Sequence, residues 1–165
     1  MEFISTRGKD GPISFETALL NGLARDGGLY LPASWPRFNL DEIRQMRDLS
    51  YPDLAGFIMS RFTDGEIDQV EMTSLARQSY ADFTHPDVAP LRPLAENIHI
   101  LELFHGPTIA FKDYAMQFLS RVFDRALTRQ KRTAVILGAT SGDTGSAALE
   151  AFKGRDSVDV FIPVS

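Results

Sequence analysis

The amino-acid sequence predicts an α/β protein in two parts: a helix-rich part over residues 1–80 and a strand–helix–strand–helix–strand part over residues 81–165. In the first part, apolar residues recur at the three- and four-residue spacing of helices. In the second part, the fully apolar run 133–137 is typical of a buried parallel strand, and a glycine-rich turn leads from it into a helical pattern. Strands that alternate with helices form layered domains around a parallel sheet.

Capping residues predict where helices of the first part begin. Ser14 is placed to cap one helix, and Asn39 with Glu42 three residues later has the spacing of a capping box. Ser50 and Asp53 repeat that spacing. Helices are therefore expected over residues 14–24, 39–47, 50–62 and 72–83.

Three strands and two helices are expected in the second part. Residues 84–86, THP, have the composition of a linker, and two more prolines follow before residue 98. Strands are expected over residues 98–104, 133–137 and 158–162. Two helices are expected between them, with apolar residues at helical spacing from Ala115 to Leu127 and from Ala147 to Phe152. We expect the three strands to share one small parallel sheet.

Composition excludes several classes of protein. The 165 residues include no cysteine, which excludes disulfides and thiolate sites. The net charge of −5 argues against nucleic acid as a partner. No apolar run approaches the roughly 18 residues that span a membrane, and the first residues lack a secretory signal pattern. We therefore expect a soluble, cytoplasmic protein.

Lys112 is the first candidate for chemistry. It alone of the four lysines follows an apolar run and opens a helix after a strand. A lysine amine must be uncharged to attack a carbonyl, and apolar neighbours and the positive end of a helix both disfavour its charged form. The position favours Schiff-base chemistry; the alternative is a lysine that extends from the helix start into solvent, paired with Asp113.

The glycine-rich loop 138–145 is the second candidate. A strand, a glycine-rich turn and a helix start together form a nest of backbone N–H groups that binds anions. The loop lacks the lysine of a P-loop and the glycine spacing of a dinucleotide site. Asp143 would oppose a phosphate, so a substrate carboxylate fits better, with Asp143 facing a proton-bearing group. The alternative is a simple βα turn capped by Ser141 or Thr144.

Other charged residues predict no further site. His99 and His105 lack the clustered acids of a metal centre, so we expect them to pack or to form turn hydrogen bonds, and we expect no metal. Three arginines at four-residue spacing are expected to form a solvated helix face: Arg121, Arg125 and Arg129.

Three segments resemble the threonine synthase family. Residues 105–113, HGPTIAFKD, resemble its cofactor-lysine motif, and residues 138–145, GATSGDTG, resemble its second signature. Residues 26–32, DGGLYLP, together with residues 5–8, STRG, resemble its N-terminal domain. The lysine motif alone would indicate only the wider group of fold-type II pyridoxal 5′-phosphate (PLP) enzymes.

The resemblance implies a PLP enzyme of threonine biosynthesis. PLP would form a Schiff base with Lys112, and O-phospho-L-homoserine and water would become L-threonine and phosphate by β,γ-replacement. The freed Lys112 amine would act as the general base, and Phe111 would line the cofactor ring. Ser141, Gly142 and Thr144 would bind the substrate carboxylate, and Asp143 would face the ring oxygen.

Length departs from the family pattern. Family members are more than twice as long, and their cofactor-phosphate loop lies beyond the point that corresponds to Ser165. We therefore expect an N-terminal domain, residues 1–80, and an incomplete start of the catalytic domain, residues 81–165, with little activity in the isolated chain. Two alternatives are another fold-type II lyase or dehydratase and a non-catalytic relative.

Overall fold

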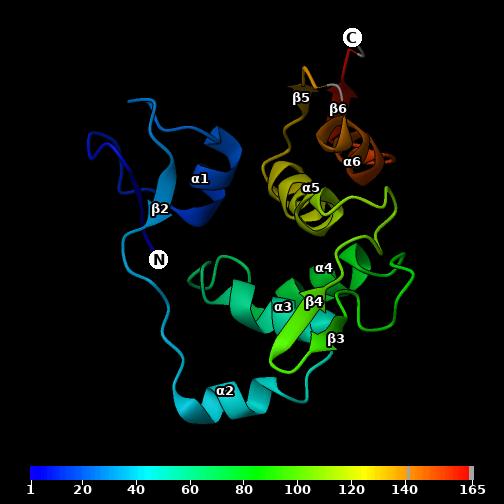
Figure 1. Ribbon diagram of the computed structural model, residues 1–165. Helices are drawn as coiled ribbons and strands as arrows, with labels where there is room; N and C mark the ends of the chain where they lie inside the picture. Colours follow the sequence, from blue (N-terminus) through cyan, green and yellow to red (C-terminus); the bar gives the residue numbers. More distant parts are fainter. Residues whose placement is uncertain (141, 164–165) are drawn as a thin grey trace. The chain divides into compact units, whose positions relative to one another are not determined.

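The computed structural model describes residues 1–140 and 142–163, and the chain divides into two units, Met1–Ala76 and Arg77–Ser165. Figure 1 shows the order of their helices and strands. The α/β class and the helix-rich first part are confirmed.

The first unit begins with a two-stranded antiparallel sheet. Strand β1 (Phe3–Ser5) pairs with β2 (Tyr30–Pro32). Helix α1 (Phe15–Asn21) lies between them in sequence and begins as predicted at Ser14, whose hydroxyl accepts the Thr17 N–H at 3.2 Å. The helix ends before the predicted residue 24, because Gly22 takes a left-handed φ of 69° that stops a helix.

The predicted capping box is present at the start of α2 (Leu40–Met46). The Asn39 side chain accepts the N–H groups of Asp41 and Glu42, each at 2.9 Å, and the Glu42 carboxylate accepts the Asn39 N–H at 2.8 Å. The other Glu42 oxygen pairs with Arg61 at 2.7 Å, which ties α2 to the end of the next helix.

Helix α3 (Tyr51–Ser60) and the first part of α4 (Gln69–Ser79) approach each other closely in the first unit. Ser50 caps α3 as predicted, and a Cβ on Gly56 would lie 2.5 Å from the Cα of Thr73, so only glycine fits there. Helix α4 begins three residues before the predicted residue 72 and ends four residues before residue 83. Its Met72 is fully buried.

The second unit contains a hairpin whose first strand was not predicted. Strand β3 (Leu91–Ala95) pairs antiparallel with β4 (Ile98–Leu101). The left-handed φ of 62° at Asn97 permits the tight turn between them. The prediction that residues 98–104 join the parallel sheet is therefore wrong, because this strand pairs with its own neighbour in sequence instead.

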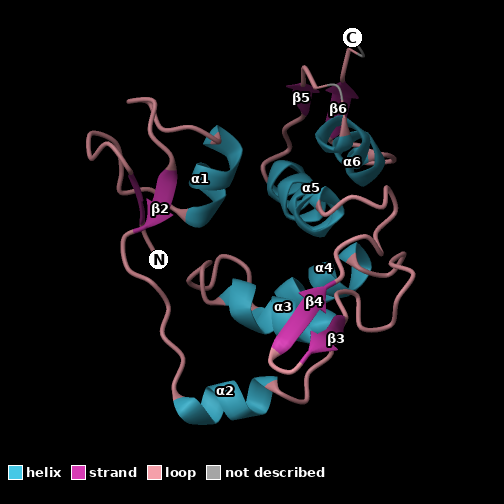
Figure 2. Cartoon of the chain, in the orientation of Figure 1, coloured by secondary structure: helices cyan, strands magenta, loops and turns pink. Residues whose placement is uncertain are grey.

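A parallel strand pair follows the hairpin (Figure 2). Helix α5 (Lys112–Arg129) leads to β5 (Ala134–Leu137), and α6 (Asp143–Phe152) connects β5 to β6 (Val158–Phe161). Residues of β5 and β6 pair in register from Ala134 with Val158 to Leu137 with Phe161. The two predicted strands and their parallel pairing are confirmed.

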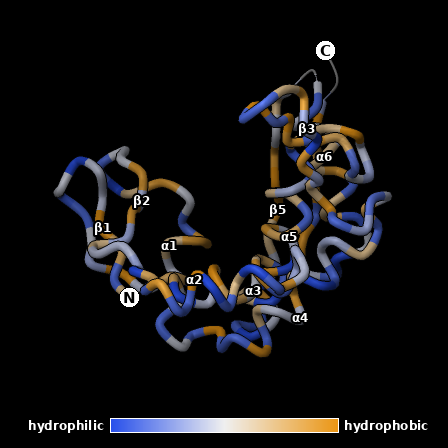
Figure 3. The backbone as a smooth tube through the Cα atoms, turned by 60° about the horizontal axis from the view of Figure 1, so that its bottom comes forward, coloured by the Kyte–Doolittle hydropathy of each residue, from blue (hydrophilic) through white to orange (hydrophobic). Residues whose placement is uncertain are grey.

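Strand β5 is half-buried on one face and exposed on the other. Figure 3 shows hydrophobic residues along β5, yet its residues alternate between half-buried and exposed. Val135 is 61% exposed and Leu137 is 78% exposed. The expectation of a buried strand is therefore wrong for the described residues, because alternate side chains of a strand point to opposite faces, and here one face is half-buried and the other is exposed.

The core of the second unit lies between α5 and α6. The rings of Phe123 and Phe152 meet edge to face with centroids 6.2 Å apart. Other residues that are nearly or fully buried on these two helices are Phe118, Val122, Ala126, Leu127, Ala147, Ala148 and Ala151. This packing fixes the two helix starts, at Lys112 and Asp143, on the same packed unit.

Candidate functional site

A hydrogen-bonded loop precedes helix α5. The Thr108 N–H donates to one Asp113 oxygen at 2.8 Å, and the Thr108 hydroxyl donates to the other at 2.7 Å. Asp113 is 0% exposed. Gly106 packs against it so closely that a Cβ would lie 2.5 Å from the Asp113 Cβ. The loop between Gly106 and Asp113 is thus closed by two charge-assisted hydrogen bonds and has no space for a side chain at Gly106.

The chain turns sharply inside this loop. Ile109 has a φ of +64°, and its N–H donates to the Gly106 carbonyl at 3.1 Å. A β-branched residue with positive φ is rare and costs energy, so the surrounding contacts must hold it. Ile109 and Phe111 are exposed, whereas Ala110 between them is buried. The turn therefore directs two apolar side chains outward beside the helix start.

Lys112 is the first residue of α5, as predicted. Its amine lies 4.7 Å from the centroid of the exposed Phe111 ring, a cation–π distance. Within residues 1–140 and 142–163, Lys112 forms no ion pair, and both Asp113 oxygens accept from Thr108 instead. The alternative in which Lys112 pairs with Asp113 is therefore wrong.

The glycine-rich loop leads into α6. Gly142 is the N-cap residue, and its carbonyl accepts the N–H groups of Gly145 at 3.0 Å and Ser146 at 3.3 Å. Among the described residues no side chain caps the helix, so the alternative with Thr144 as the cap is wrong. Asp143 is exposed and Thr144 is half-buried. Ser141, predicted to bind substrate or to cap the helix, lies outside the described residues.

The start of α6 is suited to anions. The first N–H groups of a helix have no acceptor within it, and the helix dipole is positive at this end. Gly145 is buried, and a Cβ there would lie 2.9 Å from the Thr140 side chain, so this glycine lets the loop and the helix pack together. Among the described residues, no hydrogen bond or ion pair connects this turn with Lys112.

An ionic network beside the lysine loop was not predicted. Glu102 accepts a hydrogen bond from His105 at 2.8 Å and pairs with Arg92 at 3.4 Å. The hydrogen bond from His105, and secondarily the charge of Arg92, lowers the pKa of Glu102 below its ordinary value. The ring of His105 also lies 5.0 Å from that of His85. His105 therefore forms a turn hydrogen bond, as expected, and orders the start of the lysine loop.

Arg121 does not lie on a solvated face. Its guanidinium is half-buried and donates to the Gln117 carbonyl at 2.9 Å and to the Gln117 side-chain oxygen at 3.0 Å. Burial, and then the charge of Arg155, lowers the pKa of Arg121. The prediction of a solvated arginine face is wrong for Arg121, because α6 and the turn after it pack beside this side of α5.

The described part of the chain contains neither a candidate metal site nor a membrane-spanning helix. No group of three or more histidine, aspartate or glutamate side chains there could hold a metal ion. None of the described helices has the length and apolar character needed to cross a membrane.

Comparisons with known proteins place these segments in a family. Residues 2–80 match the family model of the threonine synthase N terminus. The chain is 49% identical over 162 residues to threonine synthase of Pseudomonas aeruginosa, in a match that covers 98% of this chain and 34% of that protein. The chain thus spans about a third of the length of the curated relatives it matches.

Solved structures agree with this placement. A PLP-bound threonine synthase from Brucella melitensis matches with a TM-score of 0.95 and 50% identity, over 98% of this chain and 35% of that one. The yeast threonine synthase matches with a TM-score of 0.91 and 41% identity, over the same shares of the two chains. The chain therefore belongs to the threonine synthase family and corresponds to the N-terminal part of its members.

Proposed function

We propose that this chain is part of a PLP-dependent threonine synthase, a cytoplasmic enzyme of threonine biosynthesis that converts O-phospho-L-homoserine and water to L-threonine and phosphate. In this proposal, residues 1–80 form the N-terminal domain and residues 81–165 begin the catalytic domain. The observation that carries it is Lys112, whose amine stands at the start of α5 over an exposed aromatic ring. Within the described residues this amine forms no ion pair, so it is available for a carbonyl group.

The residues around Lys112 fit PLP. An amine without a carboxylate partner can attack an aldehyde more readily than one held in an ion pair. The exposed Phe111 ring offers a flat apolar surface for a planar cofactor. When bound, PLP supplies an electron sink for negative charge at the substrate carbon atoms.

Each proposed residue has a separate role. Lys112 holds the cofactor and then moves protons at Cα and Cβ of the substrate. Gly142 and Thr144, together with Ser141, bind the substrate carboxylate through the N–H groups at the start of α6. Asp143 accepts a hydrogen bond from a proton-bearing ring oxygen rather than meeting a phosphate, which its charge would repel.

Covalent labelling tests the assignment of Lys112. The longer protein that contains this chain is incubated with PLP, reduced with borohydride and digested with a protease. The masses of the peptides are then measured by mass spectrometry. We expect the pyridoxyl mass on Lys112 and its loss in Lys112→Ala. The exposed Lys131 serves as the control, because Lys131→Ala should leave the label unchanged. A label on another lysine would refute the assignment.

Product analysis tests the reaction. With O-phospho-L-homoserine we expect threonine and phosphate in equal amounts. A keto acid as the main product would indicate a dehydratase, and PLP labelling without any turnover would indicate a non-catalytic relative. The 165-residue chain alone should form little or no threonine, and steady production by it would contradict that part of the proposal.

A further inference from the structure

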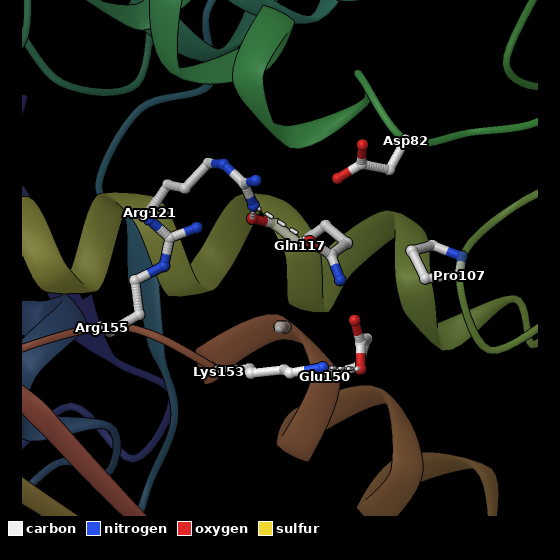
Figure 4. Close-up of a pocket in the computed structure, with 8 residues that line it drawn as sticks. Asp82, Pro107, Gln117, Arg121, Glu150, Lys153 and Arg155 are labelled. Atoms are coloured by element: carbon white, nitrogen blue, oxygen red, sulfur yellow. Dashed lines mark hydrogen bonds and ion pairs between the residues drawn. The ribbon is translucent and has the colours of Figure 1, made fainter.

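A charged pocket lies between α5 and α6 (Figure 4), and its lining includes none of the residues proposed for catalysis. It has a volume of about 220 Å³. Ligand pockets for larger organic molecules span roughly 300–1,000 Å³, so this one suits a smaller ligand. The residues that line it come from both helices, the turn after α6 and two loops: Asp82, Pro107, Gln117, Arg121, Glu150, Ala151, Lys153 and Arg155.

Two arginines in the pocket have incomplete charge compensation. Figure 4 shows the guanidinium groups of Arg121 and Arg155 turned toward each other, and the charge of Arg155 contributes to lowering the pKa of Arg121. Arg121 donates only to neutral oxygens of Gln117, which is itself 6% exposed. In the part of the chain that the structure describes, neither arginine has a carboxylate within ion-pair distance.

Buried polar atoms of the same side chains also lack partners. The Nε atoms of Arg121 and Arg155 are both buried, and neither finds an acceptor among the described residues. A buried donor without an acceptor costs free energy, and more so when it is charged. Two like charges that face each other add to that cost. The second cost decreases if an anion binds between the terminal nitrogens of the two groups.

The remaining charges leave the pocket positive. Lys153 is 4.0 Å from Glu150 and so is loosely compensated, and Asp82 lies across the pocket from this pair. Three cations and two carboxylates leave one net positive charge in the lining. Guanidinium groups match the geometry of phosphate oxygens with paired N–H donors.

We propose that this pocket binds a small phosphate group, with Arg121 and Arg155 as its ligands and Lys153 as an additional charge. The occupant is free inorganic phosphate or the phosphate of a small ester, since both present the same tetrahedral oxygens. The proposal does not depend on the reaction assigned to Lys112.

Side-chain NMR tests the proposal directly. The 165-residue chain is titrated with potassium phosphate, and the Nε–H signals of the arginines are followed, with potassium chloride at equal ionic strength as the control. We expect the signals of Arg121 and Arg155 to shift to saturation at millimolar concentrations or below. Arg155→Gln should weaken binding about tenfold or more, and the exposed Arg37→Gln should change the affinity less than about twofold.

Charge variants of the lining make the test specific. Asp82→Asn should strengthen phosphate binding about threefold, because it removes a carboxylate that repels the anion. If Arg155→Gln fails to fold, Arg155→Lys keeps the charge and should weaken binding several-fold through loss of the paired donors. O-phospho-L-serine distinguishes the two sources: tighter binding than phosphate indicates an ester, and equal binding indicates the free ion.

Several results would overturn the proposal. Shifts that do not saturate, or that chloride reproduces, would show that no phosphate site exists. An equal loss of phosphate affinity in Arg155→Gln and Arg37→Gln would show a general effect of charge. Weaker phosphate binding in Asp82→Asn would contradict an anionic ligand. Acetate that binds as tightly as phosphate would refute the assignment to a phosphate group.

Discussion

Replacement of Gly106 by alanine tests how the lysine loop is held. The new Cβ would lie 2.5 Å from both the Cβ and the Oδ2 of Asp113, and 2.8 Å from its Cγ. Asp113 cannot swing aside into solvent, because it is fully buried. Its carboxylate is also bound to Thr108 at 2.7 and 2.8 Å. Relief of the clash must therefore move the backbone or break one of these hydrogen bonds.

The expected loss of stability follows from these two ways of relieving the clash. Overpacking a dense site costs about 1–3 kcal/mol, and loss of a hydrogen bond to a charged group costs about 1.5–3 kcal/mol. Gly106→Ala should therefore lower the free energy of unfolding by about 2–4 kcal/mol. The urea midpoint, followed by circular dichroism, should fall by about 1–2 M, since m is about 1–3 kcal/mol/M for domains of this size.

A matched glycine provides the control. At Gly138 an added Cβ would lie 3.5 Å from Ile162, an ordinary contact distance. Gly138→Ala should therefore change the free energy of unfolding by less than about 0.5 kcal/mol. Equal midpoints for Gly106→Ala and Gly138→Ala would refute the view that Gly106 is needed for the close packing of Asp113.

Three further predictions concern other parts of the chain. Gly56→Ala should lower the free energy of unfolding by about 2 kcal/mol or more. The new Cβ would lie 2.5 Å from the Cα and 2.8 Å from the backbone N of Thr73. An unchanged thermal midpoint would contradict this. Met72→Ala should cost about 2–5 kcal/mol in urea unfolding, since Met72 is fully buried, and a cost below 1 kcal/mol would contradict a packed core there. The His105 hydrogen bond lowers the folded-state pKa of Glu102, so its stabilising effect is present above the ordinary value of 4.5 and is lost as pH falls through the lower folded value. Urea midpoints of the unchanged protein and of Glu102→Gln should therefore differ at pH 6 and converge near pH 3, and a difference independent of pH would refute the role of this charge.

Local signals in the sequence predicted helix starts well. Asn39 and Glu42 form their capping box, and Ser14 and Ser50 cap the helices that follow them. A helix cap involves only residues within one turn of each other, so the residue types that form it can be recognised in a short segment of the sequence. The parallel strands β5 and β6 were also predictable, because a connecting helix between two apolar runs permits few other arrangements.

Pairing partners and burial were harder to predict. The β3–β4 hairpin was missed because Pro93 makes its first strand resemble a linker, and because the turn depends on a left-handed Asn97. The partial burial of Arg121 was missed because it depends on α6 and on the turn that carries Arg155, which lie between 22 and 34 positions away in the sequence. Contacts of that separation leave no periodic signal in the segment itself.

The candidate site was predictable in part. Lys112 was located from its apolar neighbours and its helix start, and the structure places it at the first position of α5. The bonds from Thr108 to Asp113 were not foreseen, although the two residues are only five apart. An aspartate beside a lysine suggests an ion pair in sequence, and only the loop geometry shows that its carboxylate faces the other way.

The short span of the Thr108–Asp113 contact has a kinetic consequence. Loops of about ten residues close in roughly 10–100 ns, far faster than distant segments meet. Both hydrogen bonds lie within a five-residue separation, so they can form before α5 packs against α6. We therefore expect this local contact to set the direction in which Lys112 leaves the chain, and the later packing of the unit to preserve that orientation.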